Sequence, residues 1–227
     1  MTRSLAAALA LSCLGLAAPA EGGSAPWICP EPAGGTEFSW QGSAGGLSGD
    51  WKERRFKGTT RYRVVPSPHG AYLRAFSDAS ASALYRELGP VPLEGLRLCW
   101  SWKVLAFPEG ERLDRKEGDD RAAAVTVIFR WSVLPWKVRS LFYVWSGVHP
   151  PGTVLENPFA RSVRMIVLRQ GGGENWVHES RDLAADYRRA FGEESETLEA
   201  LGVFTDSDNT GGRAEAAYGP FRLARDR

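Results

Sequence analysis

Short stretches in which apolar and polar residues alternate recur along most of this 227-residue chain. Such alternation is typical of strands that bury one face and expose the other. The stretches are rich in Val, Ile, Tyr, Phe and Trp, and turn-forming Gly, Pro, Asp and Asn separate them. They predict nine strands, over residues 60–65, 71–76, 96–104, 123–131, 140–145, 163–169, 176–183, 201–205 and 214–223.

One segment follows the period of an amphipathic helix instead. Apolar side chains recur every four positions between residues 182 and 191. Asp182 can accept a hydrogen bond at the start of this segment, and Gly192 can end it in a left-handed conformation. The pattern therefore predicts a short helix near residues 182–191.

These elements together favour a mainly β fold. Polar residues such as Thr126 and Arg130 interrupt the apolar strands, as expected for half-buried strands of an antiparallel sheet. We therefore expect a two-sheet antiparallel β-sandwich, jelly-roll-like, with one short helix near residues 182–191.

The first 20 residues form a separate unit. Arg3 precedes an uncharged apolar run, and the small residues Ala18 and Ala20 stand where a signal peptidase requires them. The run is too short to cross a bilayer. We expect residues 1–20 to be a signal peptide, which makes the protein an exported one. A lipoprotein anchored through Cys13 is the weaker alternative, because Leu11 stands where a small residue is expected.

Removal of the signal peptide leaves a Gly-, Pro- and Ala-rich leader over residues 21–35 and one domain over residues 36–227. It also leaves two cysteines, Cys29 and Cys99, in an oxidising compartment. A Cys29–Cys99 disulfide is one interpretation, and two unpaired thiols are the other, because the sequence does not determine their distance.

The charge of the chain is almost balanced, with 28 Lys and Arg against 27 Asp and Glu. Nucleic-acid binding needs a strongly basic face, so this balance argues against a nucleic-acid partner. After the first 20 residues no apolar stretch is long enough to form a transmembrane segment.

Four motifs occur in order along the chain: KEGDD at 116–120, YVW at 143–145 with NP at 157–158, WxxExRD with DYxxAFG at 176–192, and TDxDNTG at 205–211. In this order they resemble the DUF3047 family, exported bacterial proteins without an assigned activity. The resemblance implies one exported β-sandwich domain, located in the periplasm or outside the cell, and it implies no cofactor or reaction.

The last of these motifs contains candidate metal ligands. Asp206, Asp208 and Thr210 offer oxygen atoms at alternate positions before Gly211, which is the kind of donor set that Ca²⁺ requires. The alternative is a β-turn in which the Asp and Asn side chains bond to nearby backbone N–H groups.

Two further pairs of polar residues are ligand-binding candidates. Asp119 and Asp120 can act as acid and base or as metal ligands, although a charged solvent-exposed loop is their ordinary explanation. Glu179 and Arg181 share one face of a predicted strand, where they either line a polar groove or form a pair that aligns the sheet.

Tryptophan is abundant, with nine in the chain. Trp100 and Trp102 share the apolar face of a predicted strand, so we expect both in the core. Tryptophans near loops can stack on sugar rings, or they can fill a wide space between sheets. Those near predicted loops are Trp40, Trp51, Trp131, Trp136 and Trp145, of which Trp136 and Trp145 are the ligand-binding candidates.

Three functions are compatible with these features. The leading hypothesis is a β-sandwich that binds a glycan or another component of the cell envelope. The second is a hydrolase or lyase that acts on polysaccharides through carboxylates. The third is a structural envelope protein that binds another protein through an aromatic patch. The carboxylates available for the second function are Asp119, Asp120, Glu179, Asp206 and Asp208.

Overall fold

The computed structural model describes residues 35–43, 45–67, 70–130, 137–195 and 197–225. Its elements are β1 (Thr36–Phe38), β2 (Lys52–Lys57), β3 (Arg61–Ser67), β4 (Gly70–Asp78), β5 (Ala81–Pro92), β6 (Leu96–Ala106), β7 (Ala123–Arg130), β8 (Val138–Ser146), β9 (Val154–Glu156), β10 (Val163–Gln170), β11 (Val177–Asp182), α1 (Leu183–Phe191), β12 (Thr197–Asp206), β13 (Arg213–Tyr218) and β14 (Phe221–Arg225).

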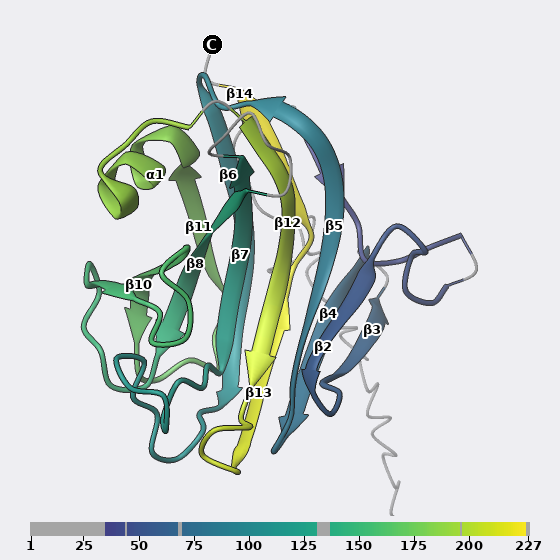
Figure 1. Cartoon of the computed structure of the whole chain (residues 1–227). Helices are drawn as coiled ribbons and strands as arrows, with labels where there is room; N and C mark the ends of the chain where they lie inside the picture. Colours follow the sequence, from purple (N-terminus) through teal and green to yellow (C-terminus); the bar gives the residue numbers. More distant parts are fainter. Residues whose placement is uncertain (1–34, 44, 68–69, 131–136, 196, 226–227) are drawn as a thin grey trace, which may run out of the picture.

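The strands form two sheets of seven that pack face to face (Figure 1). Sheet I has the order β1-β14-β6-β13-β4-β3, and β11 also pairs with β6. Sheet II has the order β2-β5-β12-β7-β8-β10-β9. Neighbouring strands run antiparallel, except that β8 and β10 run parallel. The predicted mainly β sandwich of two sheets is therefore confirmed.

The single predicted helix is also confirmed. Asp182 is the N-cap of α1, and its Oδ1 accepts a hydrogen bond from the backbone N–H of Ala185 at 2.9 Å. At the other end Gly192 adopts a left-handed φ of 72°, and its N–H donates to the carbonyl of Arg188 at 2.8 Å. Both ends of the helix are thus set by local sequence.

The strand predictions were incomplete around β5. This 12-residue strand pairs with both β2 and β12, yet its sequence ASALYRELGPVP has no clear alternation and contains good helix formers. Strand β2 was also missed, because all six of its residues are exposed at a sheet edge. The predicted last strand, 214–223, is two strands separated by Gly219 and Pro220.

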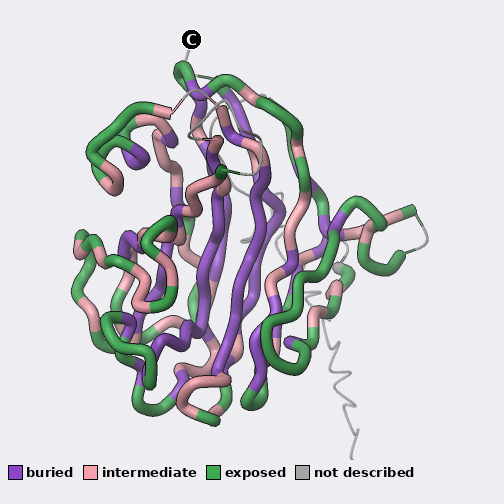
Figure 2. The backbone as a smooth tube through the Cα atoms, in the orientation of Figure 1, coloured by how far each residue is buried: buried purple, intermediate pink, exposed green. Residues whose placement is uncertain are grey.

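The core lies between the two sheets, where buried residues form continuous stretches along the strands (Figure 2). Trp100 and Trp102 are fully buried there, as predicted. Their rings meet edge to face with centroids 5.6 Å apart, and Trp100 packs against Tyr143 at 5.2 Å. Large aromatic side chains thus fill the space between the sheets.

Three of the tryptophans expected near loops are also buried. Trp40 and Trp51 pack against each other with ring centroids 4.2 Å apart, and Trp51 Nε1 donates to the carbonyl of Ser39. Trp145 lies in the core 5.6 Å from Trp102, and its Nε1 donates to the carbonyl of Gly171. Their burial in the core favours the second interpretation, in which these three rings fill the space between the sheets.

Several sequence predictions lie outside the described residues: the signal peptide, Cys13, the leader up to residue 34, Trp131 and Trp136. Cys99 is disulfide-bonded. Its predicted partner, Cys29, also lies outside the described residues, so this pairing stays a prediction. No helix in the described part of the chain is long and apolar enough to cross a membrane.

Candidate functional site: a groove on sheet II

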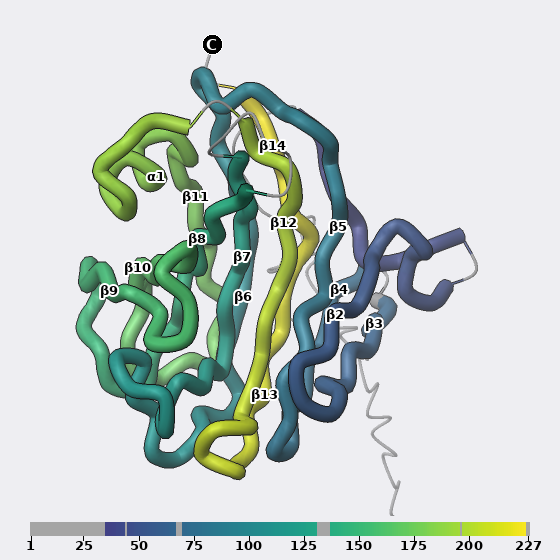
Figure 3. The backbone as a smooth tube through the Cα atoms, viewed as in Figure 1, coloured from purple at the N-terminus to yellow at the C-terminus, as the bar shows by residue number. Residues whose placement is uncertain are grey.

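The outer face of sheet II carries a groove of about 800 Å³. Strands that are distant in the sequence form its floor, because β12 lies between β5 and β7 (Figure 3). On these central strands and on β8, the small side chains of Ala83, Thr126 and Ser140 line it. Small residues at outward-facing positions leave the sheet face open to a ligand.

Phenylalanines line both sides of the groove. Phe56 comes from the edge strand β2, and Phe159 comes from the connection between β9 and β10. They are 58% and 57% exposed, high values for aromatic residues. Phe204 and Phe142 lie between them, with Phe204 centred 5.5 Å from Phe56 and 6.1 Å from Phe142. The groove therefore offers aromatic surfaces at its sides and on its floor.

One end of the groove is polar, and we call it the acidic end. Its centre is Arg121, whose Nη2 lies 2.8 Å from Asp119 Oδ2 and 3.4 Å from Asp206 Oδ2. All three side chains are buried. Asn157 adds an amide that donates to Asp119 Oδ2 at 2.8 Å. Burial of these charges is tolerable only because they are paired and hydrogen-bonded.

The loop after β12 closes around Asp120. The backbone N–H groups of Asn209 and Thr210 donate to the Asp120 carboxylate at 3.0 and 2.7 Å. As a result, carboxylate oxygens of Asp120, Asp206 and Asp208 lie within 4.8 Å of one another. This triad could hold a metal ion.

The triad differs from the predicted calcium ligands at one position. It contains Asp206 and Asp208 as expected, but Asp120 stands in place of Thr210. The Thr210 hydroxyl instead accepts a hydrogen bond from the Gly212 N–H at 3.4 Å. Asp119 and Asp120, singled out from the sequence, thus meet the 206–211 loop.

Burial dominates the electrostatics of this end. It raises the pKa of Asp206 well above the ordinary value, and Arg121 opposes this change without cancelling it. Burial likewise raises the pKa of Asp119 and of Asp208. Asp120 adds a further carboxylate, and Lys57 adds a cation that donates to the carbonyl of Asp208. Carboxylates are therefore in excess over cations.

Two buried polar atoms at this end have no hydrogen-bond partner within the described part of the chain. They are Asp119 Oδ1, an acceptor, and Arg121 Nε, a donor. Unsatisfied buried polar atoms are rare in native proteins and call for an unplaced water, ion or ligand.

Glu179 and Arg181 lie elsewhere, on β11 of sheet I. Glu179 is buried, pairs with Arg169 at 2.7 Å, and accepts a hydrogen bond from Trp102 Nε1 at 3.3 Å. Arg181 pairs with Asp186 of α1. Glu179 thus joins β11 to β6 and β10, and Arg181 joins β11 to α1, so these two side chains hold elements together and do not line the groove.

Sequence reasoning did not single out Phe56, Phe159, Asn157 or Arg121 as site residues, although Asn157 stands in one of the four motifs. Phe56 stands in the highly charged strand KERRFK, and Phe159 follows a short unpredicted strand. Arg121 comes directly after the acidic pair that the sequence had already indicated. That adjacency was the only available signal, because the partner of Arg121, Asp206, is distant in the sequence.

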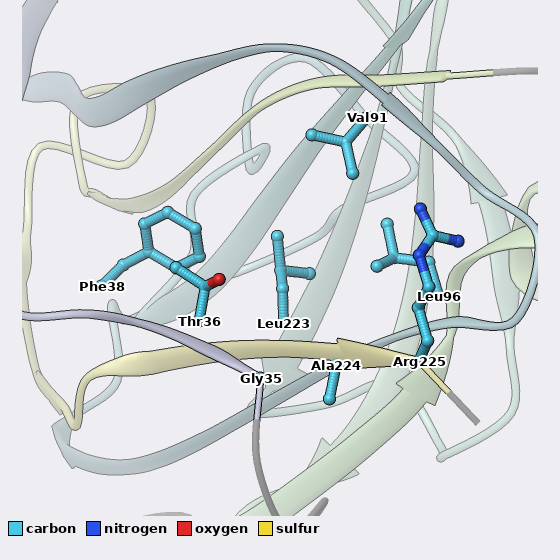
Figure 4. Close-up of a pocket in the computed structure, with 8 residues that line it drawn as sticks. All are labelled: Gly35, Thr36, Phe38, Val91, Leu96, Leu223, Ala224 and Arg225. Carbon is cyan, nitrogen blue, oxygen red and sulfur yellow. The ribbon is translucent and has the colours of Figure 1, made fainter. Parts of the chain in front are cut away.

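A second, smaller hollow of about 280 Å³ lies beside β1 and β14 (Figure 4). It is lined mainly by apolar residues, among them Phe38, Val91 and Leu223. Its one charged lining residue, Arg225, bonds to the backbone carbonyls of Pro92 and Glu94. The hollow therefore lacks the converging polar groups of a specific ligand site.

Comparisons with known proteins identify one family and several solved structures. The profile described as "Protein of unknown function (DUF3047)" matches residues 49–222. No curated protein is similar to the chain in sequence.

Three solved structures illustrate the structural similarity. The family 11 carbohydrate-binding module of the cellulase Lic26A-Cel5E of Clostridium thermocellum has a TM-score of 0.43 and 9% identity, covering 86% of this chain and 97% of the module. The Emp47p carbohydrate recognition domain has a TM-score of 0.44 and 9% identity, covering 84% and 95%. The xyloglucanase domain of NopAA from Sinorhizobium fredii has a TM-score of 0.38 and 14% identity, covering 90% and 100%. Identities of this size say nothing about the ligand of this chain.

Proposed function

The chain belongs to the DUF3047 family, and because the description of that family assigns no activity, we propose from the geometry of the groove that the protein binds a glycan there. The observation that carries this proposal is the position of Phe56 and Phe159. Both are large, exposed aromatic side chains, and both line the groove beside its acidic end.

Sugar recognition needs two kinds of contact, and the groove offers both. Aromatic rings stack against the apolar faces of pyranose rings. Carboxylate, amide and guanidinium groups bond to hydroxyls, and the acidic end supplies Asp119, Asn157 and Arg121. A sugar hydroxyl can donate to a carboxylate and accept from a guanidinium at the same time. The volume of the groove also lies in the usual range for small-ligand sites, about 300–1,000 Å³.

The test is binding to a panel of neutral and charged oligosaccharides, followed by titration calorimetry with the best binder. We expect Phe56→Ala and Phe159→Ala each to weaken binding about tenfold, which corresponds to ~1.4 kcal/mol. Val148→Ala is the matched control, because Val148 is 46% exposed but does not line the groove. Binding that is unchanged in both Phe variants, or absent for every glycan, would overturn the proposal.

We also propose that the acidic end holds Ca²⁺ through Asp120, Asp206 and Asp208. Oxygen ligands lie about 2.3–2.6 Å from Ca²⁺, so ligand atoms up to ~5 Å apart can share one ion. The spacing of the triad fits this range. The excess of carboxylates over cations at this end favours a divalent cation there.

Thermal melting in excess calcium chloride and in EDTA tests the calcium site. A ligand that binds only the folded state raises the melting temperature, so we expect a higher value in calcium. Asp208→Asn should remove this difference, whereas Asp78→Asn, an exposed carboxylate outside the groove, should keep it. Identical melting of the wild-type protein in both solutions excludes an occupied calcium site at that concentration.

A catalytic function is the second candidate, favoured by one observation. Asp119 and Asp206 line the groove, and burial raises the pKa of each, as expected for a carboxyl group that donates a proton to a leaving group. Release of reducing ends or unsaturated products from a bound polysaccharide, lost in Asp119→Asn, supports hydrolase or lyase activity. Binding without any product over extended incubation supports a binding protein.

Export is proposed from residues 1–20. Expression of the full chain in a bacterium, followed by fractionation and N-terminal sequencing, should give a mature protein that begins at Glu21. Lipid attached to Cys13 would favour the lipoprotein alternative instead.

A further inference from the structure

The balanced net charge of the chain hides a strongly uneven distribution. Residues 52–63, with the sequence KERRFKGTTRYR, contain six cationic side chains and one acidic side chain. The rest of the chain therefore carries an excess of acidic residues. Every cationic side chain of this segment is exposed.

The segment forms one edge of the sandwich, which we call the basic edge. Strand β2 is the terminal strand of sheet II, and β3 is the terminal strand of sheet I (Figure 1). Only three residues connect them, and β3 is tied to sheet II by bonds from Thr60 N–H and Tyr62 OH to Ser82. The two strands therefore meet at one edge of the sandwich. Arg54 lines the groove on sheet II. Arg61 and Arg63 alternate with Tyr62, whose hydroxyl reaches Ser82, so they extend from the opposite face of β3.

Part of this charge has no internal counter-charge. Among the described residues, Arg54, Arg61 and Arg63 form no ion pair. Arg54 lies over the ring of Phe56 at 5.3 Å, and Arg61 lies over the ring of Phe76 at 4.5 Å. These rings orient the guanidinium groups but leave their charges uncompensated.

Arg63 stands directly opposite Arg74 in the pairing of β3 with β4, and both are exposed. Arg74 is ion-paired with Glu215 of β13, so its charge is compensated, whereas Arg63 forms no ion pair among the described residues. Uncompensated cationic side chains gathered at one edge attract a ligand that supplies negative charge.

We propose that the basic edge binds an acidic polysaccharide, one that carries carboxylate or phosphate groups on its sugars. The charge of the edge calls for an anion, and the choice of a polysaccharide rests on the proposed function of the groove. Arg54 and Phe56 belong both to the groove and to residues 52–63, so a chain bound in the groove reaches the basic edge at these two residues. Phe56 is the single exposed large apolar residue of residues 52–63, and one aromatic side chain is a weak anchor for a membrane.

Binding to polygalacturonate and to its fully methyl-esterified form tests this proposal, because the two polymers share a backbone and differ in charge. We expect the wild-type protein to bind polygalacturonate more tightly than the ester, and the affinity to fall as salt is added. The double variant Arg61→Gln/Arg63→Gln should bind polygalacturonate about tenfold more weakly. The control Arg188→Gln/Arg189→Gln removes the same charge from exposed positions on α1 and should bind as the wild-type protein does.

Three results would overturn the proposal: equal binding of the acid and the ester, an unchanged affinity in the edge variant, or equal weakening in the control. Vesicles of phosphatidylglycerol that bind as tightly as polygalacturonate would make the edge a membrane surface instead. Failure of the proposed glycan site in the groove can be distinguished from failure of the proposed basic edge. If no neutral glycan binds and Phe159→Ala has no effect, but the edge variant still loses polygalacturonate, then the groove proposal fails and the edge proposal stands.

Discussion

Arg121 and Asp206 are joined through both their backbones and their side chains. The Arg121 N–H donates to Asp206 Oδ1 at 2.8 Å, the Asp206 N–H donates to the Arg121 carbonyl at 3.0 Å, and the Arg121 guanidinium lies 3.4 Å from Asp206 Oδ2. These contacts fasten the segment that enters β7 to the end of β12. The acidic end of the groove is therefore built into the sheet.

Replacement of Arg121 should cost much of the stability of the fold. Arg121→Met leaves the buried carboxylates of Asp119 and Asp206 without their cation, and we expect a loss of about 3–5 kcal/mol in the free energy of unfolding, measured in urea. The control is Arg188→Gln, which breaks an exposed pair with Glu194 and should leave the free energy of unfolding nearly unchanged. Similar losses in both variants would contradict a buried ionic centre.

Removal of the Asp186 carboxylate should destabilise the fold more than removal of the N-cap of α1. The buried Asp186 accepts hydrogen bonds from Tyr143 OH at 3.0 Å and from Arg181 Nε at 2.7 Å, so it ties α1 to the core. We expect Asp186→Ala to cost about 3 kcal/mol. Asp182→Ala removes only the N-cap and should cost about 1 kcal/mol. Chemical denaturation distinguishes the two, and the reverse order would refute this interpretation.

Gly202 has no space for a side chain. A Cβ atom there would lie 2.4 Å from the backbone oxygen of Leu84, which cannot move without disturbing the pairing of β12 with β5. Gly202→Ala should therefore destabilise the fold by about 1–3 kcal/mol, seen as a lower melting temperature. Gly49→Ala, where the added atom meets open space, should leave the melting temperature nearly unchanged.

Glu111 should make stability depend on pH. Burial raises the pKa of its carboxyl group above the ordinary 4.5, although Ser146 and the Gly147 N–H both donate to it. A raised pKa in the folded state gives stability that is present below pH 4.5 and lost as the pH rises through the folded value. Glu111→Gln has no carboxyl group to ionise and therefore does not lose this stability. The melting temperature of the variant minus that of the wild-type protein should increase as the pH rises from 4.5. A difference that stays constant with pH would contradict the prediction.

Local pattern was enough for much of the fold, because the relevant physics acts between near neighbours. Trp100 and Trp102 alternate with polar residues, and this places them in the core wherever the partner sheet lies. The helix caps are equally local. Where the alternation is weak, as in β5, pairing with β2 and β12 decides the structure, and no window of sequence contains that information.

The candidate site was accessible from the sequence only in pieces. Two features stood out separately in the sequence: the pair Asp119 and Asp120, and the loop 206–211. A charged solvent-exposed loop also explained the first, and a simple turn also explained the second. Their meeting depends on β7 lying beside β12 in sheet II. Glu179 appeared equally promising, and its burial beside Trp102 removed it from the site.

By itself, the sequence determined the mainly β character of the protein, its one helix, the core positions of Trp100 and Trp102, and its near-zero net charge. Tertiary structure decided that Trp40 and Trp51 are buried, that four carboxylates gather around Arg121, and that the basic residues 52–63 lie at an edge formed by both sheets. The physical reason is the distance along the chain over which each interaction acts. Alternation and capping depend on neighbours along the chain, whereas burial and electrostatics depend on which distant strands become adjacent.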